Sequence, residues 1–254
     1  MSATLITGAA SGIGRATALA LIGRHRLLLL DRDAAGVARL ADEAPIAAAI
    51  EAGACRTAVA DVAEPGAVAA ALDAAAGELG GFTGAVHCAG VLTLGGLAEA
   101  DPAELARALA VNAGGVAATL AALHPHLVAA GGGSVVVIGS NAGSTPRVGM
   151  GAYSASKAAA HMLARVAALE WGAEGIRVNV VAPGATDTPM QAAFGGPDAA
   201  AAAVAGDPAR YRLGIPLGRI ADPGDIAAAA AFLLSDAARQ ITGQVLVADG
   251  GCTP

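Results

Sequence analysis

Short runs of aliphatic and β-branched residues alternate along the chain with longer, alanine-rich stretches. The short runs predict strands near residues 3–7, 27–31, 56–60, 84–87, 134–139, 177–182 and 244–248. Because strands that alternate with helices form parallel sheets covered on both faces, the pattern predicts an α/β fold with a doubly wound parallel sheet of about seven strands. We expect a single domain over residues 1–254, with ligands bound beyond the carboxyl ends of the strands.

A glycine-rich turn follows the first predicted strand and reads Gly8-Ala9-Ala10-Ser11-Gly12-Ile13-Gly14, with a helical stretch after it. In dinucleotide-binding turns the first glycine permits the tight turn, the second lets the backbone approach the pyrophosphate, and the third lets helix and strand pack closely. Backbone N–H groups and the positive end of the helix dipole then face the anion. The turn therefore predicts a Rossmann-type site, with Ser11 also available as a helix N-cap. A plain strand-to-helix loop is the alternative.

The second predicted strand ends in Asp31-Arg32-Asp33. An acid at this point suits the ribose hydroxyls of NAD and would repel the 2′-phosphate of NADP. Arg32 favours NADP, because guanidinium groups bind phosphates in a forked geometry. Asp31 could instead cap the next helix, which Asp33 could do equally well. On the strength of the acid we expect NAD as the cofactor.

Ser140, Tyr153 and Lys157 carry the candidate chemistry. Tyr153 and Lys157 are four residues apart and so share one face of a helix, while Ser140 follows a predicted strand. A phenol with its pKa of about 10 is a poor base, but a nearby ammonium favours the phenolate and lowers that pKa. A shift of roughly three units needs about 4 kcal/mol. We expect Tyr153 to deprotonate an alcohol held by Ser140 while a hydride leaves the same carbon.

Together with the glycine turn, these residues resemble the short-chain dehydrogenase/reductase family over nearly the whole chain. The resemblance is carried further by Asp61-Val62, Asn112, residues 183–188 (Pro-Gly-Ala-Thr-Asp-Thr) and Asp249-Gly250-Gly251. It implies that Asn112 holds a water leading to the catalytic lysine, that Asp61 contacts adenine, and that residues 183–188 hold the nicotinamide. The cofactor-binding residues expected on this basis are Gly8, Ser11, Gly12, Ile13, Gly14, Asp31, Arg32, Asp61, Val62, Ala89, Gly90, Tyr153, Lys157, Pro183, Gly184, Thr186 and Thr188.

One departure from the family pattern lies after the fourth predicted strand. The family usually has Asn-Asn-Ala-Gly there, and this chain has His87-Cys88-Ala89-Gly90. Gly90 keeps the close backbone approach to the cofactor. His87 either adds a titrating group near the ribose or packs as a neutral histidine, and we expect the latter.

A narrower resemblance lies in residues 145–150, 186–191 and 213–220, which look like the 2,3-dihydro-2,3-dihydroxybenzoate dehydrogenases of catecholate siderophore biosynthesis. It implies oxidation of a cyclohexadiene diol carboxylate whose ketone product tautomerises to a catechol. Arg147 could then bind the carboxylate, Met150 could line the ring pocket, and Gln191 could bond the hydroxyl that does not react. The expected substrate contacts are Ser140, Arg147, Met150, Tyr153, Met190 and Gln191. A surface arginine, a core methionine and a solvated glutamine are the plainer readings of three of them.

Three other functions stay open. The first is a dehydrogenase of a related ring, such as an amino-substituted dihydrobenzoate or a cyclic alcohol of antibiotic synthesis. The second is a 3-oxoacyl-thioester reductase, which would usually use NADPH and a basic residue near Asp31. A sensor that binds NAD without turnover is disfavoured by the intact Ser140, Tyr153 and Lys157.

Composition narrows the possible partners. With 2% aromatic residues and a net charge of −6, the chain is a poor candidate for nucleic-acid binding, and an anionic substrate needs a local cation such as Arg147. Three cysteines, Cys55, Cys88 and Cys252, lack metal-ligand spacing, so we expect no metal site and a reducing compartment. Strand one begins just after Met1 and no uninterrupted apolar run reaches membrane length, so we expect a cytoplasmic protein without membrane contact.

Two expectations rest on the family resemblance. Residues 190–213 correspond to a mobile substrate lid, although the Gly-, Ala- and Asp-rich part of this segment could also be a tolerated surface insertion. The alanine-rich stretches 113–130 and 151–174 suit close helix packing, and the family commonly forms tetramers through these helices. The resemblance therefore implies a homotetramer.

Overall fold

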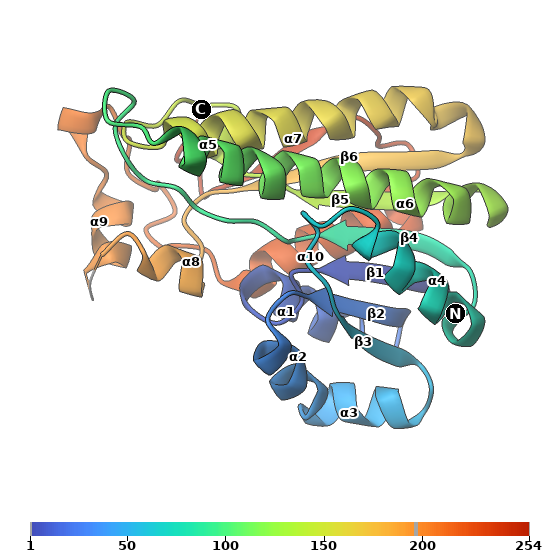
Figure 1. Ribbon diagram of the computed structural model, residues 1–254. Helices are drawn as coiled ribbons and strands as arrows, with labels where there is room; N and C mark the ends of the chain where they lie inside the picture. Colours follow the sequence, from blue (N-terminus) through green and yellow to red (C-terminus); the bar gives the residue numbers. More distant parts are fainter. Residues whose placement is uncertain (1, 196–197, 254) are drawn as a thin grey trace.

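The computed structural model of the chain describes residues 2–195 and 198–253. Within them, seven parallel strands form one sheet in the order β3-β2-β1-β4-β5-β6-β7 (Figure 1). The strands are β1 Ala3–Thr7, β2 Arg26–Asp31, β3 Cys55–Val59, β4 Phe82–His87, β5 Gly133–Ile138, β6 Ile176–Pro183 and β7 Val245–Ala248. The predicted doubly wound parallel sheet is confirmed.

Helices cover both faces of this sheet, and the alternation of side chains along each strand explains how. Leu5 and Leu28 face a core shared with α4, α6 and α7, whereas Ile6 and Leu29 face a second core that includes α1, α3 and α10. Strands buried on both faces need continuous apolar runs, such as residues 27–30. The helices are α1 Gly12–Leu21, α2 Ala34–Ala41, α3 Ala44–Glu51, α4 Ala67–Leu79, α5 Pro102–Leu109, α6 Gly115–Ala129, α7 Gly151–Glu170, α8 Pro189–Ala192, α9 Ala199–Ala205 and α10 Pro223–Leu234.

Helices α5 and α6 are joined by a π-helical turn, Ala110–Gly114, which contains Asn112. The joined stretch, Pro102–Ala129, is long and apolar enough by composition to cross a membrane. Its second half instead packs on the sheet, with Leu120, Leu123 and Leu127 buried in the core. The apolar character of this helix is therefore explained by its packing in the core.

The strand order places the functional segments at the carboxyl ends of the strands. From β1 the chain adds β2 and β3 on one side of the sheet, and from β4 it adds β5, β6 and β7 on the other side. In open parallel sheets ligands bind where the strand order reverses in this way, beyond the carboxyl ends of the strands. The segment with α8 and α9 lies at this end, on the left of Figure 1. It belongs to the predicted lid at 190–213, of which residues 196–197 lie outside the described part of the chain.

His87 ends β4 as a buried core residue. Its Nδ1 lies 3.0 Å from the hydroxyl of Thr119 on α6. Burial, together with the charge of Lys157, lowers the pKa of His87 to about 3. The expectation of a packed, neutral histidine is confirmed.

Candidate active site

Two adjoining cavities occupy the carboxyl end of the sheet. The first, of about 260 Å³, is lined by Gly8, Ser11, Gly12, Gly14, Asp31, Arg32, Asp61, Val62 and Ala89. The second, of about 380 Å³, is lined by Ser140, Arg147, Met150, Tyr153, Lys157, Pro183, Gly184, Thr186 and Gln191. Both are lined by Ile13, Gly90, Thr188 and Met190, together with Cys88. Every residue predicted for cofactor or substrate thus lines one cavity or both, and only Asn112 lies behind their walls.

The glycine turn lines the first cavity with backbone that carries no side chains at Gly8, Gly12 and Gly14. Gly8 has a φ of +64°, and a Cβ there would lie 2.7 Å from the backbone nitrogen of Ala89. A Cβ on Gly14 would overlap the carbonyl oxygen of Gly8, so helix and turn can approach only without side chains. The turn therefore fits the pyrophosphate of a dinucleotide, which needs free N–H groups at a helix start. Ser11 occupies the N-cap position of α1, as predicted, although its hydroxyl makes no capping bond.

Asp31 is held by two backbone groups at the rim of the first cavity. Its carboxylate accepts the N–H of Ala10 and the N–H of Asp33, both at 3.0 Å. Asp33, not Asp31, occupies the N-cap position of α2. Arg32 is directed to Asp61, with 3.6 Å between Nη1 and Oδ2. A fixed carboxylate therefore lines the first cavity, and the neighbouring guanidinium is directed toward a second acid.

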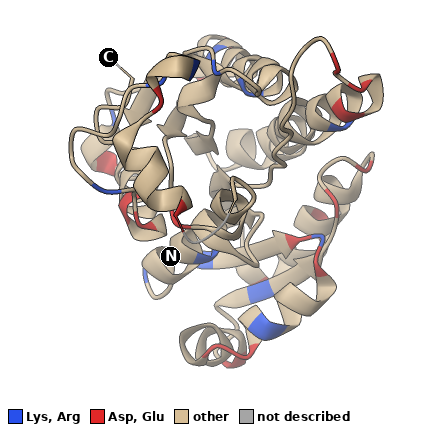
Figure 2. Ribbon diagram, turned by 90° about the vertical axis from the view of Figure 1, so that its left-hand side faces the viewer, with Lys and Arg blue, Asp and Glu red and all other residues tan. Residues whose placement is uncertain are grey.

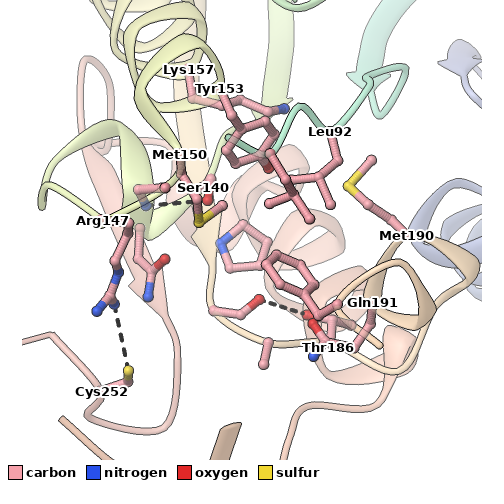
Figure 3. A pocket seen from close by; sticks show the side chains of 18 of the residues that line it. Leu92, Ser140, Arg147, Met150, Tyr153, Lys157, Thr186, Met190, Gln191 and Cys252 are labelled. Carbon is pink, nitrogen blue, oxygen red and sulfur yellow. Dashed lines mark hydrogen bonds between the residues drawn. The ribbon is translucent and has the colours of Figure 1, made fainter. Parts of the chain in front are cut away.

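Ser140, Tyr153 and Lys157 converge on the second cavity from two elements (Figure 3). Tyr153 and Lys157 lie on successive turns of α7, Ser140 follows β5, and all three side chains are buried. The Lys157 ammonium lies 5.9 Å from the centre of the Tyr153 ring and donates to the carbonyl of Ile138 at 3.0 Å. The predicted trio is thus assembled, with the lysine fastened to the end of the adjoining strand.

Burial controls the ionisation of both groups. It raises the pKa of the Tyr153 phenol, although a hydrogen bond with Ser140 acts in the opposite direction. It also lowers the pKa of Lys157 to about 8. The prediction of a lowered phenol pKa is therefore wrong for the protein alone, because loss of water disfavours both charged forms and decides the net direction. In so dry a site, however, the ammonium attracts the phenolate strongly once the proton has left.

Asn112 acts from behind the cavities. Its Oδ1 accepts the N–H of Val91 at 2.8 Å, and its Nδ2 donates to the Val91 carbonyl and to the Ser156 hydroxyl, both at 2.9 Å. Gly90 packs between this amide and the Lys157 ammonium. A Cβ on Gly90 would lie 3.1 Å from the Asn112 Oδ1 and 3.3 Å from the Lys157 Nζ. The π-helical turn thus holds the segment after β4 against α7.

Arg147 lines the second cavity, but its guanidinium turns away from Ser140 and Tyr153 (Figure 3). It donates one N–H to the Cys252 sulfur at 3.5 Å, and the Cys252 thiol bonds the carbonyl of Leu213 at the same distance. This chain of contacts joins the loop before α7, the C-terminal segment and the end of the lid. Most of the five guanidinium N–H groups remain available to a ligand.

Sequence reasoning missed several residues of this cavity. Arg210 and Arg212 line it from a short hairpin closed by two hydrogen bonds between the backbones of Asp207 and Arg212, with Tyr211 at a φ of 54°. The apolar wall also includes Leu92, Leu94 and Phe194. The only sequence signal was two arginines in an otherwise alanine-rich segment.

Charge is distributed unevenly. Acidic and basic residues are spread around the periphery of the end that carries α8 and α9 (Figure 2). The second cavity, by contrast, is lined by four cationic side chains, those of Arg147, Lys157, Arg210 and Arg212, and by one carboxylate, that of Asp207. In the described part of the chain, no group of three His, Cys, Asp or Glu could hold a metal. A local excess of positive charge in a protein of net charge −6 suits an anionic ligand.

Comparison with known proteins shows which proteins this chain is similar to. A family model described as "Enoyl-(Acyl carrier protein) reductase" matches residues 8–253. The vibriobactin-specific 2,3-dihydro-2,3-dihydroxybenzoate dehydrogenase of Vibrio cholerae is 45% identical over 194 residues, which are 76% of this chain and 74% of that protein. The 2,3-dihydro-2,3-dihydroxybenzoate dehydrogenase of Escherichia coli (strain K12) is 37% identical over 250 residues, 98% of this chain and 95% of that protein.

A solved structure extends the likeness to the cofactor. The 7α-hydroxysteroid dehydrogenase complexed with NADH and 7-oxo glycochenodeoxycholic acid superposes with a TM-score of 0.89 at 29% identity, over 99% of this chain and 94% of that one. The fold agrees with that of this solved structure. The chain belongs to the short-chain dehydrogenase/reductase family and is an oxidoreductase that acts on a small-molecule CH–OH donor with a nicotinamide cofactor.

Proposed function

We propose that the protein oxidises a ring diol carboxylate with NAD, most specifically 2,3-dihydro-2,3-dihydroxybenzoate to 2,3-dihydroxybenzoate in catecholate siderophore biosynthesis. The observation that carries the proposal is the second cavity. Its lining includes the buried Ser140 and Tyr153 together with apolar and arginine side chains. Two dehydrogenases named for this substrate, at 45% and 37% identity, support the choice of ring. The anionic carboxylate explains why cations collect there.

The reaction follows from the placement of the trio. Bound at the glycine turn, NAD would supply the acceptor for the hydride that leaves the carbinol carbon. Ser140 donates to the alcohol oxygen and fixes it, and Tyr153 takes the hydroxyl proton. Tyr153 must be the phenolate before this transfer and becomes the neutral phenol by it, and Lys157 stabilises that phenolate across a site that excludes water. The carbon–oxygen double bond that forms belongs to a cyclohexadienone, and its tautomerisation to a catechol draws the reaction toward oxidation.

Substrate orientation would come from the walls of the cavity. Arg147 offers its unused N–H groups to the carboxylate, with Arg210 on the opposing hairpin. Met150 and Met190 form adaptable apolar surfaces for the ring, and Gln191 offers an amide to the hydroxyl that does not react. We place the boundaries of the substrate lid at residues 190–213 within a single domain over residues 1–254.

We also propose a cytoplasmic location. Cys55, Cys88 and Cys252 are all free thiols, two of them buried, as expected of a protein from a reducing compartment. The substrate class agrees with this, because ring diol carboxylates are intermediates of small-molecule metabolism.

Tyr153→Phe tests the chemistry. The variant should keep NAD binding, measured by fluorescence titration, and should lose turnover of the ring diol by roughly a hundredfold or more, because the proton acceptor is gone. Tyr211→Phe is the matched control, since Tyr211 is 91% exposed. Full activity of Tyr153→Phe would refute the mechanism. A wild-type preference for 3-oxoacyl thioesters over ring diol carboxylates would refute the substrate.

Asp31→Ser tests the cofactor. Removing the carboxylate should raise the KM for NAD roughly tenfold or more, as expected for a charge-assisted hydrogen bond, and should improve the use of NADP by relieving repulsion. Asp33→Ser, the adjacent exposed acid, should leave the ratio of kcat/KM values unchanged. Equal kcat/KM for NAD and NADP in the wild type would show that Asp31 does not discriminate.

Arg147→Gln tests the carboxylate contact. The KM for the ring acid should rise roughly tenfold to a hundredfold, as for a lost charged hydrogen bond, while the primary amide of the same ring should bind as before. Arg39→Gln serves as control, because Arg39 pairs with Asp33 on the surface and lines neither cavity. Equal losses on acid and amide would mean that Arg147 acts only through the loop that it ties to Cys252.

We propose a homotetramer as well. Met162, Val166 and Leu169 expose apolar side chains on α7, and Phe232 on α10 and Leu246 and Val247 on β7 are exposed as well. Exposed apolar side chains on several elements suit a protein with more than one subunit contact, as in a tetramer of dihedral symmetry. Light scattering should give a mass near four times that of one chain, and a monomer at micromolar concentration would contradict the proposal.

A further inference from the structure

His161 lies one helical turn beyond Lys157 on α7, and its imidazole is buried against the loop that carries Ser140. Its Nε2 lies 3.3 Å from the backbone nitrogen of Ser140, and its Nδ1 lies 3.5 Å from the hydroxyl of Ser144. A backbone N–H is only a donor, so Nε2 must be the acceptor in this contact. The ring is therefore neutral and carries its proton on Nδ1.

Two glycines make room for this ring. A Cβ on Gly139 would overlap the His161 Nε2, and a Cβ on Gly143 would lie 2.7 Å from its Cε1. Side chains are thus excluded on both sides of Ser140 along the chain, and the imidazole fills the space that they would take. The histidine and the two glycines form one packing unit around the serine.

The rest of the serine loop is held from other directions. The Ser140 hydroxyl accepts the N–H of Ala142 at 3.2 Å, and the Asn141 amide donates to Asp249 at 3.1 Å. Neither bond connects the loop to α7, the helix that bears Tyr153. The contact with His161 does so directly, and it therefore bears on the distance between the Ser140 and Tyr153 hydroxyls.

We propose that His161 is a positioning residue, which fixes the Ser140 hydroxyl relative to the Tyr153 phenol by accepting the Ser140 N–H, and which does so only as the neutral imidazole. The inference rests on the proposed alcohol oxidation by Ser140 and Tyr153, and it adds the residue that sets their spacing.

The surroundings keep the ring neutral. Burial, and then the charges of Lys157 and Arg165 on the same helix, lower the pKa of His161 to about 4. The carboxylate of Asp249, which follows β7, is connected to the serine loop through Asn141. It accepts hydrogen bonds from Thr253, Asn141 and Gly251. Because the folded pKa lies below the free value of about 6.5, the neutral form persists until the pH falls toward 4. Below that the protonated Nε2 can no longer accept from Ser140.

The test compares His161→Leu with His161→Gln. Leucine fills the slot without an acceptor, so kcat should fall roughly tenfold to a hundredfold while the KM for NAD stays unchanged. Glutamine brings an amide oxygen near the position of Nε2 and should restore most of kcat. As the pH falls through the His161 pKa, the ratio of the wild-type kcat to the His161→Gln kcat should fall, because protonation of Tyr153 affects both proteins alike. His124→Gln, at a surface histidine bonded to Glu174, is the control.

Equal losses in His161→Leu and His161→Gln, or a normal kcat in His161→Leu, would overturn the proposal. Gly139→Ala provides a second route, because its methyl group should displace the ring: it should cost as much as His161→Leu, and combining the two should cost little more. Fully additive losses would count against a shared mechanism.

Nitrogen-15 NMR of the imidazole tests the proposal without any substrate. It should show the proton on Nδ1 and titration well below 6.5, and a protonated Nε2 at neutral pH would overturn the inference. Kinetics are measured on whichever cyclic alcohol the wild type oxidises. If that alcohol is not a ring diol carboxylate, the proposed substrate fails, while the NMR result and the His161 series still decide the role of His161.

Discussion

Two hydrogen bonds between helix α7 and the end of strand β5 set the geometry on which the site depends. Lys157 donates to the Ile138 carbonyl at 3.0 Å, and His161 accepts from the Ser140 N–H at 3.3 Å. Both bonds are buried, where an unmatched donor or acceptor is costly. The helix that carries Tyr153 therefore cannot shift along the strand without leaving a polar group unpaired. The spacing of serine, tyrosine and lysine follows from that restraint.

The same burial that makes this restraint strong also determines the charge state of the site. It shifts the pKa of Tyr153 upward and that of Lys157 down to about 8, so that in the protein alone the phenol is neutral. Deprotonation of the phenol beside the ammonium creates an ion pair of no net charge in a region of low dielectric. Tyr153 must therefore lose its own proton before it can accept that of the alcohol, and the charge of Lys157 offsets part of the free-energy cost of that loss.

The sequence was sufficient for those parts of the site that lie at strand ends or within one helix. The glycine turn and Ser140 each follow a strand, Asp31 is the last residue of one, and the carboxyl ends of parallel strands lie at the same end of the sheet. Residues whose role depends on packing between distant segments could not be found in this way. His161 is recognisable only once Gly139 and Gly143 are beside it, and Arg210 only once its hairpin lines the same cavity as Arg147. The phenol pKa was mispredicted because a spacing reveals a neighbouring charge but not burial.

The site divides into a part that fixes the reaction and a part that chooses the substrate. The first is built from strand ends, α7 and glycines that exclude side chains, so little in it can vary without loss of geometry. The second consists of irregular segments: the loop with Arg147, the hairpin with Arg210, and the C-terminal residues around Cys252. These segments are joined by the bonds of Cys252 to Arg147 and to Leu213 rather than by the sheet. A change in any one of them can therefore alter the recognition of the ring while hydride and proton transfer remain the same, which is why membership of the family defines the chemistry more tightly than the substrate.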